Sequence, residues 1–203
     1  MPTRLISFLF TAVVFGSVSF AQTLLPQTTP GQTTVAAIPD PAITAAQRLR
    51  WLAHVNLSPM TLLEDIALGA EDTRVNSPKE YGPHWVGFGK RVGITAANYG
   101  VKTAMEAGLG AIWGEDPRYE RTQGEAVPNR LGNVVKMTFM ARNRAGNVVP
   151  AYARLIAIPG GSFLANTWMP DSQAKVGDAV VRAGLSFLSR MSENAWKEFL
   201  PRH

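Results

Sequence analysis

One long segment, residues 85–113, most strongly constrains what this chain can fold into. Placed on a helical wheel at about 100° per residue, its small side chains fall within one stripe about 120° wide. Charged and polar side chains lie on the far side of the wheel. Side chains this small let another backbone approach closely, so the spacing predicts a helix that packs through its small face. This helix-packing face comprises Gly89, Gly93, Ala97, Gly100, Ala104 and Gly108.

Two alternatives stay open for what covers this small face. Another helix of the same chain would make it part of the core, whereas a membrane or a second copy would make it an interface. Charges at Lys90, Arg91, Lys102 and Glu106 interrupt the segment. No uncharged run therefore reaches the roughly 20 residues that span a bilayer. The sequence favours the packed core and keeps a homo-oligomer as the alternative.

The first 21 residues have the composition of a secretory signal peptide. Arg4 is their only charge, and residues 5–20 are apolar apart from Ser and Thr. Ser19 and Ala21 are small residues three and one positions before a cleavage point at Gln22. The sequence therefore predicts an exported protein, located in the periplasm or cell envelope or outside the cell.

Composition narrows the kinds of site that this chain can carry. Cysteine is absent, so an exported form has no disulfide bonds and depends on burial alone for stability. The three histidines, His54, His84 and His203, show no ligand spacing, and we expect neither a metal site nor a cofactor. The net charge of +5 suits either an ordinary solvated surface or attraction to an anionic membrane surface. No nucleic-acid-binding motif is present.

The remaining sequence predicts one mainly α-helical domain of about five to six helices. Residues 22–39 form an uncharged leader rich in Thr, Gln and Pro, and residues 40–203 form the domain. Asp40-Pro41 and Ser58-Pro59 are typical helix starts, because proline fits the first helical position.

Two further signals concern helix ends in the second half of the chain. Gly114 is placed to end the small-residue helix. Asp171 and Ser172 offer an N-cap for a last helix that runs to about residue 199. The apolar residues of that last helix share one face and its charged residues share the other, which predicts an amphipathic surface helix.

The segment 131–158 fits two structures. Its valines favour strand, whereas the spacing of its methionines fits helix equally well. Residues 142–147 form a turn. We favour a helix on each side of this turn, and a β-hairpin over residues 134–153 is the alternative.

A charged turn after Gly114 is the candidate polar site. Two adjacent carboxylates beside two guanidinium groups could perform acid–base chemistry or bind an anionic or sugar ligand. The structural alternative is a turn that ends the preceding helix and pairs its own charges. The candidate residues are Glu115, Asp116, Arg118, Tyr119 and Arg121.

Several short motifs resemble an uncharacterised group of secreted acidobacterial proteins. The group pairs a Gly-Phe-Gly-x-Arg start, present at residues 87–91, with a Glu/Gln-Asp-Pro-Arg-Tyr turn, present at residues 115–119. It also has an Asn-x-Trp/Tyr segment and a closing Asn-x-x-x-Glu-Phe, which match residues 166–168 and 194–199. The resemblance covers about residues 50–200. It implies export, a helical domain and a bacterial envelope setting, and it supplies no catalytic residues.

These observations lead to two hypotheses about function. The first is a non-enzymatic binding or structural domain of the cell envelope, which uses its helical faces to bind another envelope protein or a membrane surface. The second is a small envelope enzyme that acts on sugar or phosphate polymers through the turn at residues 115–121.

Overall fold

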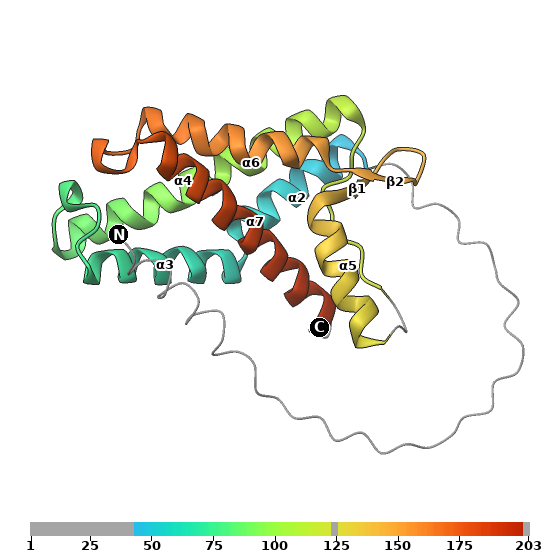
Figure 1. Cartoon of the computed structure of the whole chain (residues 1–203), viewed down its shortest axis with the longest axis horizontal. Coiled ribbons are helices and arrows are strands. Elements are labelled where there is room, and N and C mark those ends of the chain that lie inside the picture. Colours follow the sequence, from blue (N-terminus) through green and yellow to red (C-terminus); the bar gives the residue numbers. More distant parts are fainter. Residues whose placement is uncertain (1–42, 123–125, 201–203) are drawn as a thin grey trace, which may run out of the picture. The chain divides into compact units, whose positions relative to one another are not determined.

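The computed structural model describes residues 43–122 and 126–200, which belong to the unit formed by residues 38–203. The described part is mainly helical, as the sequence predicts (Figure 1). The predicted signal peptide, the leader and the Asp40-Pro41 pair lie outside the described residues. The elements are α2 (Ala45–Leu57), α3 (Pro59–Arg74), the 3-10 helix η1 (Lys79–Tyr81), α4 (His84–Trp113), α5 (Val127–Phe139), β1 (Met140–Arg142), β2 (Val148–Pro150), α6 (Tyr152–Leu164), the 3-10 helices η2 (Ala165–Thr167) and η3 (Asp171–Gln173), and α7 (Val176–Phe199).

Local signals in the sequence set the ends of α3 and α4. Pro59 is the first residue of α3, and Ser58 Oγ accepts a hydrogen bond from Thr61 N at 3.1 Å, which confirms the Ser58-Pro59 start. Gly114 ends α4 in the left-handed conformation with φ 74°, as predicted.

The start of α7 differs from the prediction. Asp171 and Ser172 belong to η3 and do not cap the last helix. α7 begins only at Val176, where Asp178 Oδ2 accepts a hydrogen bond from Lys175 N at 3.2 Å. An acidic side chain in the first turn, which interacts favourably with the helix dipole, takes the place of the expected cap.

The ambiguous segment contains both predicted structures. α5 and α6 are helices, and between them β1 and β2 pair antiparallel in the register Met140↔Pro150 and Arg142↔Val148. Asn143 closes the turn, because its side chain accepts hydrogen bonds from Ala145 N and Asn147 N, both at 3.0 Å. The helices and the hairpin are therefore neighbours rather than alternatives.

α4 is the helix around which the described unit is arranged. It packs against α2, α3 and α6, while α7 packs against α6 and α5. Figure 1 shows α6 lying along α4, with α7 crossing in front of them. The two strands extend from the end at which α5 and α6 meet.

α4 turns its polar side inward, opposite to the prediction. Most of the residues that its wheel assigned to the far, polar side are buried, namely Arg91, Asn98, Lys102 and Glu106. The small face lies outside: Gly89, Gly93, Ala97, Ala104 and Gly108 are exposed, and Gly100 is half-buried.

The prediction that the small face packs against another helix of this chain is therefore wrong. A Cβ atom added at Gly89, Gly93 or Gly108 would meet no heavy atom within 4 Å. The physical reason is that Glu106 has buried ionic partners on α6 and α7, and a buried charge requires its partners. Coverage of the small face by a second copy stays a prediction.

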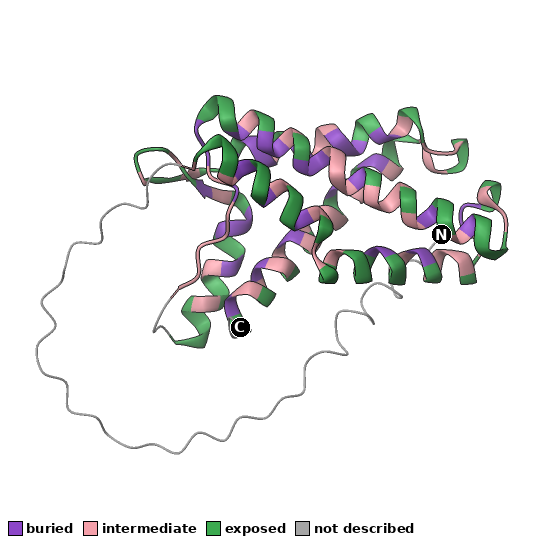
Figure 2. Cartoon of the chain, turned by 180° about the vertical axis from the view of Figure 1, so that it is seen from behind, coloured by how far each residue is buried: buried purple, intermediate pink, exposed green. Residues whose placement is uncertain are grey.

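The interior is built mostly from alanine and polar side chains. Short side chains bring the helix backbones close together, and the polar groups bridge between them. Figure 2 shows the buried residues as separate short bands, with exposed residues over much of each helix. The buried alanines are Ala107, Ala141, Ala151, Ala153, Ala157, Ala165, Ala179 and Ala183, and the larger buried apolar residues are Trp51, Val55, Val134, Met137 and Ile158.

Two glycines near the start of α4 give a matched test of this orientation. A Cβ at Gly87 would lie 2.8 Å from Tyr81 O, whereas a Cβ at Gly89 meets open space. We expect Gly87→Ala to lower the free energy of unfolding by about 1–3 kcal/mol through overpacking. Gly89→Ala should raise it by about 0.5–1 kcal/mol, because alanine favours helix. Denaturant titration measures both, and destabilisation by Gly89→Ala would show that the small face is covered.

Candidate functional site

The structure separates the residues of the predicted polar turn. Glu115 is buried, and its carboxylate accepts a hydrogen bond from Ala153 N at 3.0 Å, in the first turn of α6. Its backbone oxygen accepts a hydrogen bond from Arg48 Nη2 at 2.7 Å. Glu115 therefore joins the end of α4 to the start of α6 and favourably places a negative charge at a helix N-terminus.

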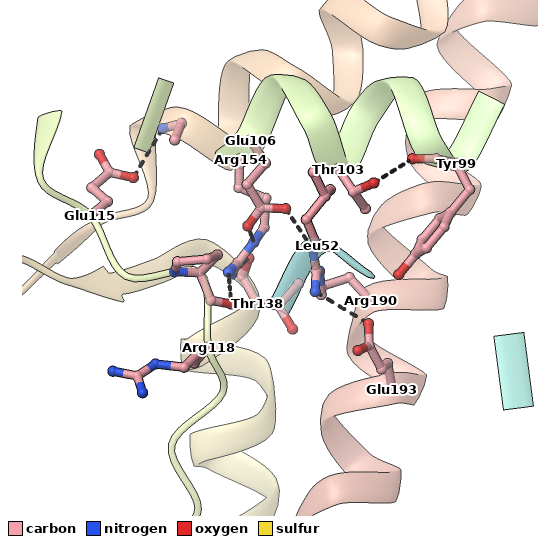
Figure 3. Close-up of polar contacts among 12 residues, drawn as sticks. Leu52, Tyr99, Thr103, Glu106, Glu115, Arg118, Thr138, Arg154, Arg190 and Glu193 are labelled. Atoms are coloured by element: carbon pink, nitrogen blue, oxygen red, sulfur yellow. Dashed lines mark hydrogen bonds and ion pairs between the residues drawn. The ribbon is translucent and has the colours of Figure 1, made fainter. Parts of the chain in front are cut away.

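Asp116 and Arg118 bind each other. Asp116 Oδ2 lies 2.6 Å from Arg118 Nη2 and 2.9 Å from Arg118 Nε. Asp116 N also donates to Arg142 O at 2.8 Å, which attaches the turn to β1. Figure 3 shows the Arg118 side chain pointing away from Glu106 and Arg154.

Tyr119 and Arg121 attach the turn to the end of α7. Tyr119 Oη donates to Glu198 Oε2 at 2.7 Å, and Arg121 Nη1 donates to Leu200 O at 3.0 Å. Glu198 is fully buried and also accepts from Arg130 Nε at 3.1 Å. Burial opposes its ionisation, but the hydrogen bonds from Tyr119 and Arg130 lower the pKa of Glu198 below its usual value.

The five predicted residues thus serve three separate structural contacts and do not form one site. The pocket lined by Glu106, Glu115, Asp116 and Arg154 has no room for a water molecule. Their side-chain arrangement supports the structural alternative, in which the turn pairs its own charges and ends the helix.

The charged cluster that the sequence analysis missed lies deeper. Glu106 on α4 sits between two arginines, with its Oε1 2.8 Å from Arg154 Nε on α6 and its Oε2 2.5 Å from Arg190 Nη2 on α7 (Figure 3). All three side chains are less than one tenth exposed. Arg190 Nη1 also contacts Glu193 Oε2 at 3.2 Å. The cluster therefore connects three helices through charge-assisted hydrogen bonds.

Arg154 has further partners in the backbone. It donates to Met137 O at 2.7 Å, to Thr138 O at 3.0 Å and to Pro117 O at 3.3 Å. Burial lowers the pKa of Arg154, although the charge of Glu106 opposes that shift. The guanidinium thus holds the last turn of α5 and the loop after α4 against α6.

Arg190 and Glu193 shift each other's pKa. Burial alone would lower the pKa of Arg190, but Glu106 and Glu193 raise it above its usual value. Burial would likewise raise the pKa of Glu193, but the charges of Arg190 and Lys197 lower it. Each group is held in its charged form by its neighbours, which is the arrangement of a structural ion network.

Another buried arginine, Arg91, organises the loop before α4. Arg91 is 1 % exposed, and its guanidinium donates to Ser77 O at 2.9 Å and to Gly82 O and Pro78 O, both at 2.8 Å. It also donates to Asn76 Oδ1 at 3.1 Å. One side chain therefore binds three carbonyl groups of this loop.

The described part of the chain contains neither a metal-binding cluster nor a membrane-spanning helix. Across residues 43–122 and 126–200, no group of three metal-binding side chains is arranged to hold an ion. Within the same ranges, no helix combines the length and the apolar character needed to cross a membrane.

Comparisons with known proteins find no relative. The chain matches no protein-family model, no curated protein and no solved structure. The resemblance to secreted acidobacterial proteins therefore stays a prediction that rests on its short motifs.

The signal for the missed cluster was present in the sequence. Arg154 is the only charge between residues 151 and 170, an otherwise apolar and small-residue stretch. Lys102 and Glu106 likewise interrupt the small-residue helix. An isolated charge in an apolar segment calls for a buried partner of opposite charge, and that criterion points to Glu106 and Arg154.

Glu106→Gln tests the role of the cluster. The change leaves Arg154 and Arg190 buried without their shared counter-charge, and breaking one side of a buried ion network costs about 3–5 kcal/mol. The matched control is Glu120→Gln, because Glu120 forms an ion pair with Arg142 in which both side chains are substantially exposed. Exposed pairs contribute about 0–1 kcal/mol. Urea unfolding of the two variants should separate them clearly, and equal small losses would contradict the assignment.

Asp65 provides a test by pH. Burial and, to a smaller extent, the charge of Glu64 raise the pKa of this buried residue of α3 from 3.8 to about 6. Between pH 3.8 and about 6, Asp65 therefore keeps its proton in the folded chain and loses it in the unfolded chain. The stabilisation that this proton gives the folded chain is full below about pH 4 and is lost as pH rises through about 6. Asp65→Asn should raise the melting temperature relative to the wild type more at pH 7.5 than at pH 4. A shift that is the same at both pH values would contradict this.

Proposed function

We propose that this protein is a non-enzymatic helical binding domain of a bacterial cell envelope, and that it binds the surface of a membrane through its outward apolar side chains. One observation carries the proposal: large apolar side chains lie outside on several helices, while ionised side chains lie inside. Export rests on the predicted signal peptide. The enzyme hypothesis loses support, because the turn at residues 115–121 uses its polar side chains for internal contacts.

α3 exposes its apolar side chains and buries a carboxylate. Met60, Leu63 and Ile66 are spaced as one helical stripe and are all exposed, Leu63 by 59 %. The buried side of α3 carries Asp65 and Gly69 instead. An ordinary surface helix has the opposite arrangement, with its apolar stripe against the core.

α7 shows the same arrangement on another side of the unit. The predicted division of its wheel into an apolar and a polar face is sound, but the polar face points inward. Arg190, Asn194 and Glu198 are buried, whereas Val180 and Leu188 are exposed by 57 % and 55 %. Exposing a large apolar side chain costs about 1.5–3 kcal/mol relative to burying it. Contact with a non-aqueous phase would recover that free energy.

A membrane surface suits this distribution better than a single protein partner. The exposed apolar side chains occur on α2, α3, α4, α5, α6 and α7. Fluid lipid can adapt to apolar side chains spread over several helices, whereas a protein partner needs one complementary surface. Trp85 and Trp113, at the two ends of α4, are 83 % and 45 % exposed, and tryptophan is enriched where membrane and water meet. The net charge of +5 adds attraction to anionic lipid.

Flotation with lipid vesicles tests the proposal. The exported protein, purified without detergent, should float with vesicles of phosphatidylcholine and phosphatidylglycerol. Leu63→Glu and Val180→Glu, on different helices, should each reduce the bound fraction several-fold, because a charge on the lipid-facing side opposes insertion. Ala145→Glu in the hairpin turn makes the same change in net charge and should leave binding intact.

Three outcomes would overturn the membrane proposal. One is the absence of flotation, and another is an equal loss in Ala145→Glu, which would reveal attraction by charge alone. Loss of all binding in 0.5 M NaCl would have the same meaning, because salt at that concentration screens exposed charges. A detergent-free sample that is dimeric by analytical ultracentrifugation and does not float would favour self-association through the outer faces.

A further inference from the structure

A second group of buried polar side chains lies where α4, α6 and α7 meet, and it contains cations without matching carboxylates. Lys102 on α4 is 9 % exposed, and its Nζ lies 2.7 Å from Ser186 Oγ on α7. Its stem runs against α6, because a Cβ at Gly161 would lie 2.7 Å from Lys102 Cγ. The position of this ammonium group is therefore fixed by all three helices.

Arg182 approaches the same region from α7. Its Nη1 donates to Gln173 O at 2.7 Å, and its Nη2 donates to Ser162 O at 3.1 Å and to Asn166 Oδ1. Its Nε is buried and has no hydrogen-bond partner among the described residues. The hydroxyl of Ser162, a fully buried residue next to Gly161, also has no partner there.

Charge distinguishes this group from the Glu106 cluster. Within residues 43–122 and 126–200, neither Lys102 nor Arg182 forms an ion pair with a carboxylate. Burial and, to a smaller extent, the positive charge of Arg182 lower the pKa of Lys102 to about 8. Burial also lowers the pKa of Arg182, although Asp178 opposes that shift. Lys102 is buried and Arg182 is half-buried, and two such cations that repel each other are unfavourable unless an anion compensates them.

We propose that Lys102, Arg182 and Ser162 form a binding site for a small tetrahedral oxyanion, namely a phosphate group. The two free N–H groups of the Lys102 ammonium, the Nε–H of Arg182 and the hydroxyl of Ser162 are its hydrogen-bond donors. Ser186 is a positioning residue, because its hydroxyl donates to Arg182 O at 2.8 Å and accepts from Lys102. A bound phosphate would satisfy the unpartnered donors and neutralise the paired positive charges.

Phosphate could reach this site as a free ion or as the headgroup of a phospholipid. The site itself is independent of the proposed function, and only its lipid form rests on the membrane binding proposed above. The experiments are therefore separated into one without lipid and one with vesicles.

The first experiment compares melting temperatures in sodium phosphate and in sodium chloride of equal ionic strength at pH 7. A ligand that binds only the folded chain stabilises it by mass action, so phosphate at about one hundred times Kd should raise the wild-type melting temperature by about 5–10 °C. Lys102→Met should lose this gain, because it removes the cation that binds the phosphate. We expect the variant to fold, since an apolar side chain of similar length replaces a buried cation.

Two further variants make the comparison specific. Lys90→Met removes the same charge from the exposed side of α4 and should keep the full gain in phosphate. Ser162→Ala removes one donor without removing a charge, so it should bind phosphate more weakly even if Lys102→Met fails to fold. No phosphate effect in the wild type, or an equal gain in Lys102→Met or Ser162→Ala, would overturn the proposal.

The second experiment identifies the source of the phosphate. Vesicles of phosphatidylcholine are compared with vesicles that also contain phosphatidic acid, whose headgroup is an exposed phosphomonoester. If the site takes lipid headgroups, Lys102→Met loses the preference for phosphatidic acid while Lys90→Met keeps it. If the preference is unchanged but the phosphate gain depends on Lys102, the ligand is a free anion. Failure of all vesicle binding would refute the proposed function and leave the phosphate result valid.

Discussion

The structure depends on the ion network in which Glu106 binds Arg154 and Arg190. These side chains come from α4, α6 and α7, and Arg154 continues the network to the carbonyl groups at the end of α5. Because a buried charge is tolerated only beside its partners, the network sets the rotation of each of these helices about its axis. An amphipathic helix whose charged side is held inside must present its apolar side outward. The exposed valines of α7 and the exposed glycines of α4 follow from this single constraint.

The buried alanines allow the helices to come close enough for the ion network to form. Ala153 and Ala157 lie on the inner side of α6 beside Arg154, and Ala179 and Ala183 lie on the inner side of α7. Side chains of this size let the helices approach until arginine and glutamate can bridge them directly. Little apolar surface is buried in such an interior, so burial contributes less to stability here than in a core of leucines and phenylalanines. Hydrogen bonds to charged groups, each contributing about 1.5–3 kcal/mol, carry a correspondingly larger share.

The sequence predicted the helices far better than it predicted their orientation. Ser58-Pro59 and Gly114 act within one or two turns, so local physics alone sets these helix ends. The wheel of α7 likewise separated its apolar and charged faces correctly. A wheel cannot say which face points inward, because that depends on partners far away in the sequence: Glu106 lies 84 positions before Arg190. For α4, the expectation that the small side chains mark the packed face gives the wrong direction, because the buried partners of Glu106 lie on α6 and α7.

The same distinction explains why the residues of the candidate turn do not form one site. Residues 115–121 look like a polar site because their charges are adjacent in the sequence. Adjacent charges of opposite sign readily form ion pairs with each other, as Asp116 and Arg118 do. Lys102 and Arg182 are 80 positions apart in the sequence and lie on different helices, so no local pattern connects them. What marks each of them is that the carboxylate one turn away on its own helix is engaged elsewhere. Glu106 binds Arg154 and Arg190 instead of Lys102. Asp178 accepts a hydrogen bond from Lys175 N and forms no ion pair with Arg182. In a chain with a polar interior, an isolated charge is the sequence feature that points to a buried partner, and a buried cation without a carboxylate points to a ligand.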